Sequence, residues 1–198
     1  MRYATAMVLM LVLCVVVPRD PRAGCYWDSD TLRTEATGLP EAVDTIVGRF
    51  DRFPDLYYQM RLDRAAKALE SSSDLLNELD DAAMASERLG KSDDAVAWLE
   101  KKRLALERLK VSKGEQDEVY KEHQYRYLAN LGTTLAHRWL HDGANREKME
   151  DLRRARDLIA AAIELNPQAH FGREKYQLMA IEWLIEPTPA DSMGISTF

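Results

Sequence analysis

A stretch of 112 residues without proline, from Asp55 to Asn166, constrains the fold of this chain more than any other feature. Proline is excluded from helix interiors and from central strands. Ala, Leu, Glu, Lys and Arg, which favour helix, dominate the stretch, and runs of β-branched residues are missing. Glycines at positions 90, 114 and 143 mark turns between segments with helical periodicity. The sequence therefore predicts an all-α fold.

The apolar spacing predicts where the helices lie. The expected ranges are 40–50, 54–70, 75–89, 92–109, 117–140, 148–165 and 171–185, followed by a loose tail at 187–198. Ser92 is expected to cap the helix that it begins. Leu56, Tyr57, Met60 and either Ala68 or Leu69 are expected to form the inner stripe of the helix at 54–70. The last helix carries the apolar residues Tyr176, Met179, Ala180, Trp183 and Leu184.

Residues 1–24 have the pattern of an export signal. Arg2 precedes an unbroken apolar run of twelve residues, 6–17. At about 1.5 Å per residue this run is too short for a bilayer core of roughly 30 Å. A short basic start and a short apolar run are instead typical of a secretory signal. The sequence therefore predicts export to the periplasm or cell envelope, with the N-terminus either cleaved or kept as a membrane anchor.

Cys25 follows Ala23 and Gly24, an arrangement that resembles the cleavage site of a bacterial lipoprotein. Arg22 stands where the lipoprotein pattern has an aliphatic residue, and where ordinary signal cleavage prefers a small one. If the signal carrying Cys14 is removed, Cys25 is the one thiol of the mature chain. It is then acylated, free or paired between chains, and these alternatives stay open.

Small and apolar residues recur from about 125 to 167 at the spacing of two packed helices. They are Leu128, Leu131, Gly132, Leu135, Ala155, Ile159 and Ala162, with Pro167 at the end. We expect Gly132 to let the two helices approach closely opposite the small Ala155, and Pro167 to stop the second helix. The pattern resembles a tetratricopeptide (TPR) repeat.

A weaker copy of this pattern lies at about 76–109. Its matched residues are Leu79, Ala83, Ala95 and Leu99. Ala83 stands where glycine is usual, and no proline closes the unit. The copies are offset by 49 residues from Leu79 to Leu128 but by 60 from Ala95 to Ala155, against a period of about 34. We therefore expect inserted residues in turns at 111–124 and 139–150.

The TPR resemblance implies a short α-solenoid at 54–186, preceded by an N-terminal segment at 25–53. That segment begins Cys-Tyr-Trp-Asp-Ser-Asp-Thr-Leu, which resembles the start of uncharacterised exported bacterial TPR proteins. About three stacked units are needed for stability, so the helices at 40–50 and 54–70 are expected to cap the front. The last helix is either a rear cap or one side of a homo-oligomer interface.

The resemblance also implies a concave groove, lined by the first helix of each pair, that holds a protein or peptide partner. Carried over by spacing, the groove residues are Asn77, Asp80, Met84, Glu87 and Arg88 in the first unit, and Arg126, Ala129, Thr133 and His137 in the second. The alternative is that several of these side chains merely solvate the inner helices. The set lacks the pattern of TPR proteins that clamp a C-terminal carboxylate, which disfavours that ligand.

Catalytic and metal-binding patterns are weak. His137 and His141 are four residues apart, a spacing that can place two imidazoles on one metal, but the glutamate of zinc proteases is missing between them. We expect both histidines on a polar helix face near a loop. Asp28-x-Asp30 lacks the rest of a calcium loop and is interpreted as a turn. No glycine-rich phosphate loop, nucleophile elbow or Cys-x-x-Cys is present in the sequence, and no cofactor is predicted.

Charge clusters are interpreted as solvent-facing. Adjacent residues on a helix diverge by about 100°, so Asp80-Asp81 and Asp93-Asp94 do not converge on one substrate. Lys101-Lys102-Arg103 is likewise expected to be a solvated stripe. The net charge is −6, and removal of residues 1–24 leaves −8, so no basic nucleic-acid surface is expected.

The sequence thus predicts a non-catalytic interaction module or scaffold of the bacterial cell envelope. The alternative is an oligomerisation or assembly subunit without a peptide groove. A third hypothesis is a small metal-dependent enzyme built on His137 and His141.

Overall fold

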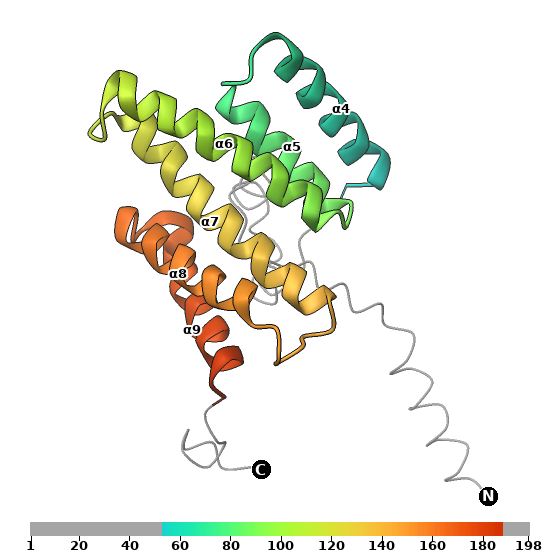
Figure 1. Ribbon diagram of the computed structural model, residues 1–198, viewed down its shortest axis with the longest axis vertical. Coiled ribbons are helices and arrows are strands. Elements are labelled where there is room, and N and C mark those ends of the chain that lie inside the picture. Colours follow the sequence, from blue (N-terminus) through green and yellow to red (C-terminus); the bar gives the residue numbers. More distant parts are fainter. Residues whose placement is uncertain (1–52, 188–198) are drawn as a thin grey trace, which may run out of the picture.

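The computed structural model describes residues 53–187, and all the regular structure in that range is helical (Figure 1). The elements are α4 (Asp55–Ser71), α5 (Leu76–Arg88), α6 (Ser92–Lys113), α7 (Glu118–His141), α8 (Glu150–Leu165), the short 3-10 turn η2 (Ala169–Gly172) and α9 (Glu174–Ile185). The predicted all-α fold is confirmed. The export signal, Cys25, the helix at 40–50 and nearly all of the tail lie outside the described residues. None of the described helices is both long and apolar enough to cross a membrane.

Successive helices run antiparallel, and each packs mainly against its neighbours along the chain (Figure 1). α5 also contacts α7, and side-chain hydrogen bonds join α7 to α9. On the other side, Arg154 of α8 donates to Glu100 of α6 at 2.7 Å. The helices therefore form two layers, with α5, α7 and α9 in one and α4, α6 and α8 in the other.

The turns lie where the glycines predict them. Gly90, Gly114 and Gly143 have φ values of 75°, 89° and 86°, which glycine adopts without the steric cost that other residues meet. Asp117 caps α7 by accepting a hydrogen bond from the backbone N–H of Tyr120 at 3.0 Å. The predicted cap at Ser92 is wrong, because Ser92 is already the first helical residue of α6 and makes no capping bond.

The extra residues between the two sequence copies are placed differently from what we expected. Residues 111–124 mostly lengthen helices, because α6 has 22 residues and α7 has 24, compared with 13 in α5. The turn between α6 and α7 spans only 114–117. The second insertion is a loop over much of its length, since α7 ends at His141 and α8 begins at Glu150.

The predicted repeat residues form the core. Those that are at most 9% exposed are Leu79, Ala83, Ala95, Leu99, Leu128, Leu131, Leu135, Ala155, Ile159 and Ala162, and Gly132 is buried with them. A Cβ added at Gly132 would lie 2.8 Å from Ile159 Cγ1 and 3.1 Å from the carbonyl oxygen of Ala155. The expected close approach of α7 and α8 at Gly132 is thus confirmed. Pro167 is exposed just after the end of α8.

The inner stripe predicted for α4 is wrong in part. Leu56 and Met60 are exposed and Tyr57 is half-buried, whereas Tyr58, Arg61 and Ala65 are buried. In α9, Tyr176, Met179, Ala180 and Trp183 are exposed and Leu184 is half-buried, whereas Glu174 and Ile181 are buried. In both end helices the apolar residues are spread around the circumference, so periodicity alone does not select the packed face.

Candidate functional site

The groove residues that we predicted on α5 and α7 lie on facing sides of the two helices. Asn77 accepts a hydrogen bond from Arg126 Nη1 at 3.1 Å. Glu87 Oε1 lies 3.1 Å from Nδ1 of His137. The structure thus brings residues from the two copies together. We call the predicted groove residues of α5 and α7, together with the side chains that they and their neighbours on α7 contact on α9, the polar seam.

Most of the predicted groove residues are not open to a partner, which corrects our expectation. Seven of the nine are at most 8% exposed: Asp80, Met84, Glu87, Arg126, Ala129, Thr133 and His137. Asn77 is exposed and Arg88 is half-buried. Among them, Asp80, Glu87, Arg126, Thr133 and His137 engage polar groups of other helices. The alternative that they merely solvate the inner helices is therefore also wrong for the buried members.

A charge cluster lies at one end of the polar seam. Lys102 Nζ donates to both carboxylate oxygens of Asp80 at 2.5 and 2.6 Å, and Lys102 is fully buried. His123 Nδ1 and Arg126 Nη1 lie 3.6 and 4.0 Å from Asp80 Oδ2. Arg126 also bonds Glu122, whose side chain is 55% exposed. The cluster joins α5, α6 and α7.

The two buried partners have shifted pKa values. Burial alone would raise the pKa of Asp80, but the charge of Lys102 and the neighbouring His123 together hold it below its ordinary value of 3.8. Burial lowers the pKa of the Lys102 ammonium, and the attraction of Asp80 recovers only part of that shift. Both observations follow from removing an ion pair from water. Asp80 and Lys102 therefore hold the helices together and are not in a position to react with a solute.

His137 lies at the other end of the polar seam. Its ring is 6% exposed and contacts the carboxylate of Glu87. His141 is exposed one turn later, with the two ring centroids 6.2 Å apart. Within the described range, no group of three or more His, Cys, Asp or Glu side chains is arranged to hold a metal ion. The expected position of both histidines on a polar face is correct for His141 but wrong for His137.

α9 is attached to α7 by two further polar contacts. Tyr125 Oη donates to Glu174 Oε1 at 2.5 Å, and both residues are buried. Gln177 Nε2 donates to Thr133 Oγ1 at 2.8 Å. The polar seam therefore runs from α5 across α7 to α9.

Sequence reasoning missed Lys102, Glu174 and Gln177. Lys102 is not a solvated residue, although its neighbours Lys101 and Arg103 have outward positions. One signal was available, because Lys102 falls on the helical spacing of Ala95, Leu99 and Leu106, which are all buried. A lysine on an apolar stripe indicates a buried acidic partner. The sequence carries no comparable signal for Glu174 or Gln177.

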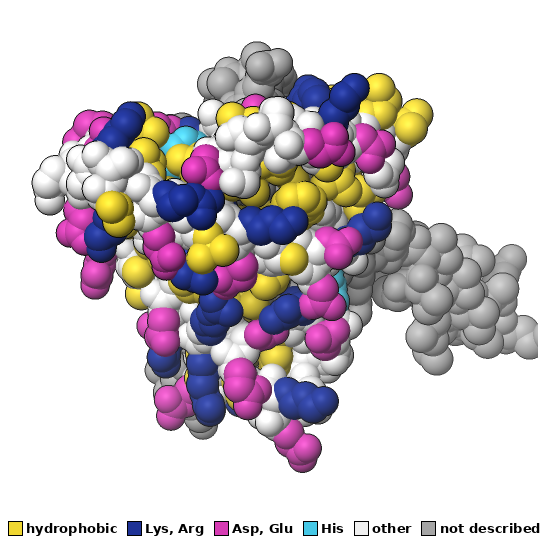
Figure 2. Space-filling view, turned by 45° about the horizontal axis from the view of Figure 1, so that its top comes forward, with side chains coloured by type: hydrophobic (Ala, Val, Ile, Leu, Met, Phe, Trp, Pro, Cys, Tyr) yellow, Lys and Arg dark blue, Asp and Glu magenta, His cyan; other side chains and the backbone are white. Residues whose placement is uncertain are grey.

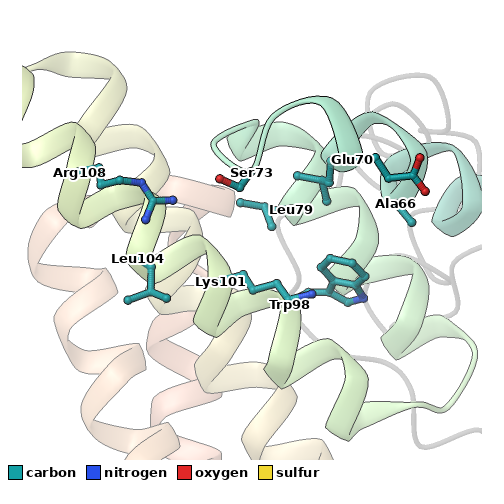
Figure 3. A pocket seen from close by; sticks show the side chains of 9 residues that line it. Ala66, Glu70, Ser73, Leu79, Trp98, Lys101, Leu104 and Arg108 are labelled. Carbon is teal, nitrogen blue, oxygen red and sulfur yellow. The ribbon is translucent and has the colours of Figure 1, made fainter.

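A pocket of about 450 Å³ lies on the opposite layer, between α4, α5 and α6 (Figure 3). Its lining residues are Ala66, Leu69, Glu70, Ser73, Leu79, Trp98, Lys101, Leu104 and Arg108. Lys101 Nζ lies 3.7 Å from the centroid of the Trp98 ring, a cation–π contact. Arg108 at the far side is bonded to Asp74. The pocket is an apolar crevice whose rim is already occupied by these charged groups.

The remaining surface has mixed charge. On the face shown in Figure 2, Lys and Arg side chains are interspersed with Asp and Glu, and hydrophobic side chains show between them. This face has no large area of one sign, as nucleic-acid or membrane-surface binding would need.

No protein-family model, no curated protein and no solved structure matches this chain.

Proposed function

We propose that this chain is a non-catalytic protein–protein interaction module built on a TPR-like α-solenoid. The observation that supports this proposal is a similar sequence separation in three contacts across the polar seam, although a fourth, between Thr133 and Gln177, spans 44 residues. Asn77 and Arg126 are 49 residues apart, Glu87 and His137 are 50 apart, and Tyr125 and Glu174 are 49 apart. Side chains that bridge equivalent helices of a stacked repeat show such a similar separation. On this basis α5, α7 and α9 are the first helices of successive units.

The partner that we propose is an extended peptide segment of mixed charge. The buried members of the polar seam fix the spacing of α5, α7 and α9. The surface beside them is therefore already ordered, and binding a partner there costs little conformational entropy. We assign direct contact to the exposed Asn77 and Glu122 and to the half-buried Arg88 along its edge. An amide, a guanidinium and a carboxylate together suit a segment that carries both charges and backbone hydrogen-bonding groups.

We place this activity in the bacterial cell envelope because residues 1–24 have the pattern of an export signal. Mass spectrometry of the mature N-terminus tests this part of the proposal. A chain that begins at or near Cys25 supports export, and a lipid on Cys25 shows attachment to the membrane. An intact, unmodified N-terminus in the cytoplasmic fraction would contradict it.

A photo-crosslinking amino acid placed at Asn77 tests the binding surface. The matched control carries the crosslinker at Arg153, an exposed residue of α8 in the other layer. Crosslinking is carried out in cells that produce the full chain, and products are identified by mass spectrometry. We expect a discrete adduct from position 77 that position 153 does not give.

Charge reversal provides an independent check. We expect Arg88→Glu to abolish the position-77 adduct, whereas Arg153→Glu leaves it unchanged. Circular dichroism confirms that both variants keep their helices. Equal adducts from both positions, or no effect of Arg88→Glu, would show that the partner does not use this edge.

A further inference from the structure

The crevice between α4 and α6 has its walls and floor within residues 66–108. Its volume of about 450 Å³ is in the range of sites that bind small ligands, about 300–1,000 Å³. α4 and α6 both pack on α5 but make few contacts with each other, which leaves space above Leu79. The packing of these three helices therefore creates the crevice.

The interior of the crevice is apolar. Ala66 and Leu69 on α4 form one side, Trp98 and Leu104 on α6 form the other, and Leu79 of α5 lies at the base. Leu104 is 45% exposed, although it is a large apolar residue. A ligand that covers it removes apolar surface from water, which favours binding. The crevice therefore suits a ligand with an apolar body.

Two opposite charges lie on the two walls, Lys101 on α6 and Glu70 on α4 (Figure 3). Neither is within 4.0 Å of an oppositely charged group in the described part of the chain. Lys101 Nζ lies 3.7 Å from the centroid of the Trp98 ring, which holds the ammonium at the crevice but offers no acceptor oxygen. Arg108 differs, because Asp74 accepts its hydrogen bonds. The crevice thus presents one cation and one anion with which a ligand can pair.

We propose that the crevice binds a short apolar peptide with free termini, its ammonium against Glu70 and its carboxylate against Lys101. A fatty acid matches the apolar walls and Lys101, but it brings a second negative charge close to Glu70. A long-chain amine has the converse defect at Lys101. A zwitterion pairs with both groups.

The length of the crevice also agrees with such a ligand. Trp98 and Arg108 are ten residues apart, which is about 15 Å along α6. A fully extended tripeptide spans at most about 10 Å. Three residues can therefore lie within the crevice with both termini at its walls.

This site goes beyond the proposed function, since it lies between α4 and α6 and not at the edge of the polar seam. The two ideas fail separately. Loss of the crosslink at position 77 says nothing about the crevice, and a crevice that binds no peptide says nothing about the partner segment.

Trileucine is the probe, and its binding to the full chain is measured by isothermal titration calorimetry. Three related peptides separate the features that the site recognises. N-acetyl-trileucine lacks the ammonium, trileucine amide lacks the carboxylate, and triglycine keeps both termini but has no apolar side chains. Decanoate tests a plain apolar anion.

Two variants remove the charges one at a time, Glu70→Gln and Lys101→Met. The matched control is Lys113→Met, which removes an exposed cation from the same helix outside the crevice. All three positions are exposed, so we expect the variants to fold, and circular dichroism checks that they keep their helices.

We expect trileucine to bind with 1:1 stoichiometry and triglycine to give no measurable heat of binding. Each blocked peptide should bind about three- to fivefold more weakly than trileucine, as loss of a partly exposed ion pair implies. Glu70→Gln should weaken trileucine by a similar factor without weakening N-acetyl-trileucine further. Lys101→Met should do the same for trileucine without weakening the amide further, and Lys113→Met should change nothing.

Four outcomes would overturn the proposal. Trileucine that binds no better than triglycine shows that the crevice takes no apolar peptide. Equal affinities for trileucine and both blocked peptides show that the termini are not recognised. No effect of Glu70→Gln and Lys101→Met, or an equal effect of Lys113→Met, shows that the peptide binds elsewhere. Decanoate that binds more tightly than trileucine, and more tightly still to Glu70→Gln, shows that the crevice takes an apolar anion.

Discussion

Gly132 of α7 lies so close to Ile159 of α8 that a methyl group at position 132 would stand 2.8 Å from Cγ1 and 2.9 Å from Cδ1 of the isoleucine. The carbonyl oxygen of Ala155 would be 3.1 Å away. Ile159 and Ala155 are fully buried, so the isoleucine has little room to move. The separation of α7 and α8 is therefore set by the missing side chain at position 132.

Replacing Gly132 by alanine should destabilise the protein. In an exposed helix interior this change stabilises by about 1 kcal/mol. Here the added methyl overpacks a full interface, which costs about 1–3 kcal/mol. We expect a net loss of about 1 kcal/mol in the free energy of unfolding, measured by urea denaturation. An unchanged or increased stability would mean that the helices separate freely at this point.

A double-mutant cycle identifies the contact responsible. Ile159→Val removes Cδ1 and alone should cost about 1 kcal/mol through the space that it leaves. In the Gly132→Ala background that space receives the new methyl, so we expect the same change to cost less than half as much. Additive effects would show that Gly132→Ala acts elsewhere.

The helices and their turns could be predicted because their causes are local. The stretch without proline and the positive-φ glycines define the segments, and the buried positions of α8 follow one regular stripe of Leu152, Ala155, Ile159 and Ala162. The end helices could not be oriented in this way. Leu56 and Met60 are at least as apolar as Tyr58, yet they are exposed and Tyr58 is buried, so hydrophobicity along the helix does not select the packed face.

The polar seam was only partly predictable. Equivalence between the two copies assigns Asn77, Glu87, Arg126 and His137 to one groove but predicts no contacts among them; the structure places Asn77 near Arg126 and Glu87 near His137. The equivalence also does not predict burial, because the charges that make burial tolerable come from other helices. The partner of Asp80 is Lys102, 22 residues away on α6, and a sequence pattern within one helix cannot reveal it.

Replacing only one partner of the buried Asp80–Lys102 ion pair should lower the free energy of unfolding much more than replacing both partners. Asp80→Asn leaves the Lys102 ammonium buried without its counter-ion, and such changes cost about 3–5 kcal/mol. The double variant Asp80→Leu with Lys102→Met fills the site with apolar groups, so we expect it to recover most of that loss. Arg103→Met is the control and should change stability by less than about 0.5 kcal/mol, because its side chain is 42% exposed. Additive losses in the double variant would contradict this prediction.

The same pair should make stability depend on pH in acid. The pKa of Asp80 is lower in the folded protein than its ordinary value of 3.8. Its carboxylate therefore stabilises the fold fully above pH 3.8, and this contribution is lost as the pH falls below that value through the folded pKa. We expect the stability difference between wild type and Asp80→Asn to be largest near neutral pH and to shrink below pH 4. Urea titrations at several pH values measure it, and a constant difference would show that Asp80 is not charged in the fold.

The protein should lose stability even when Arg138 is replaced by the similarly charged lysine. Its Nε and Nη2 donate to the two oxygens of Asp151 at 2.7 and 2.9 Å, and its Nη1 donates to Asp93 at 2.8 Å. These bonds raise the pKa of the guanidinium and join α6, α7 and α8. A lysine cannot reproduce the planar fork, so we expect Arg138→Lys to cost about 1 kcal/mol. The Arg103 side chain is 42% exposed, compared with 23% for Arg138, so Arg103→Lys should cost less than half as much. Equal losses in urea denaturation would mean that the fork adds nothing.

Tyr125→Phe should loosen α9 without loosening the rest of the array. The variant loses the hydrogen bond to Glu174, a bond to a buried charged group that contributes about 1.5–3 kcal/mol. α9 has 12 residues and two buried ones, so it depends on this contact more than α7 or α8 depends on any one bond. Amide hydrogen exchange measures the effect, and we expect residues 174–185 to exchange at least about tenfold faster. The slowest amides of α7 and α8 should keep their rates. Tyr176→Phe on the exposed side of α9 is the matched control and should leave exchange unchanged. If Tyr125→Phe instead accelerates exchange uniformly over the whole chain, Tyr125 stabilises the array globally and not α9 in particular.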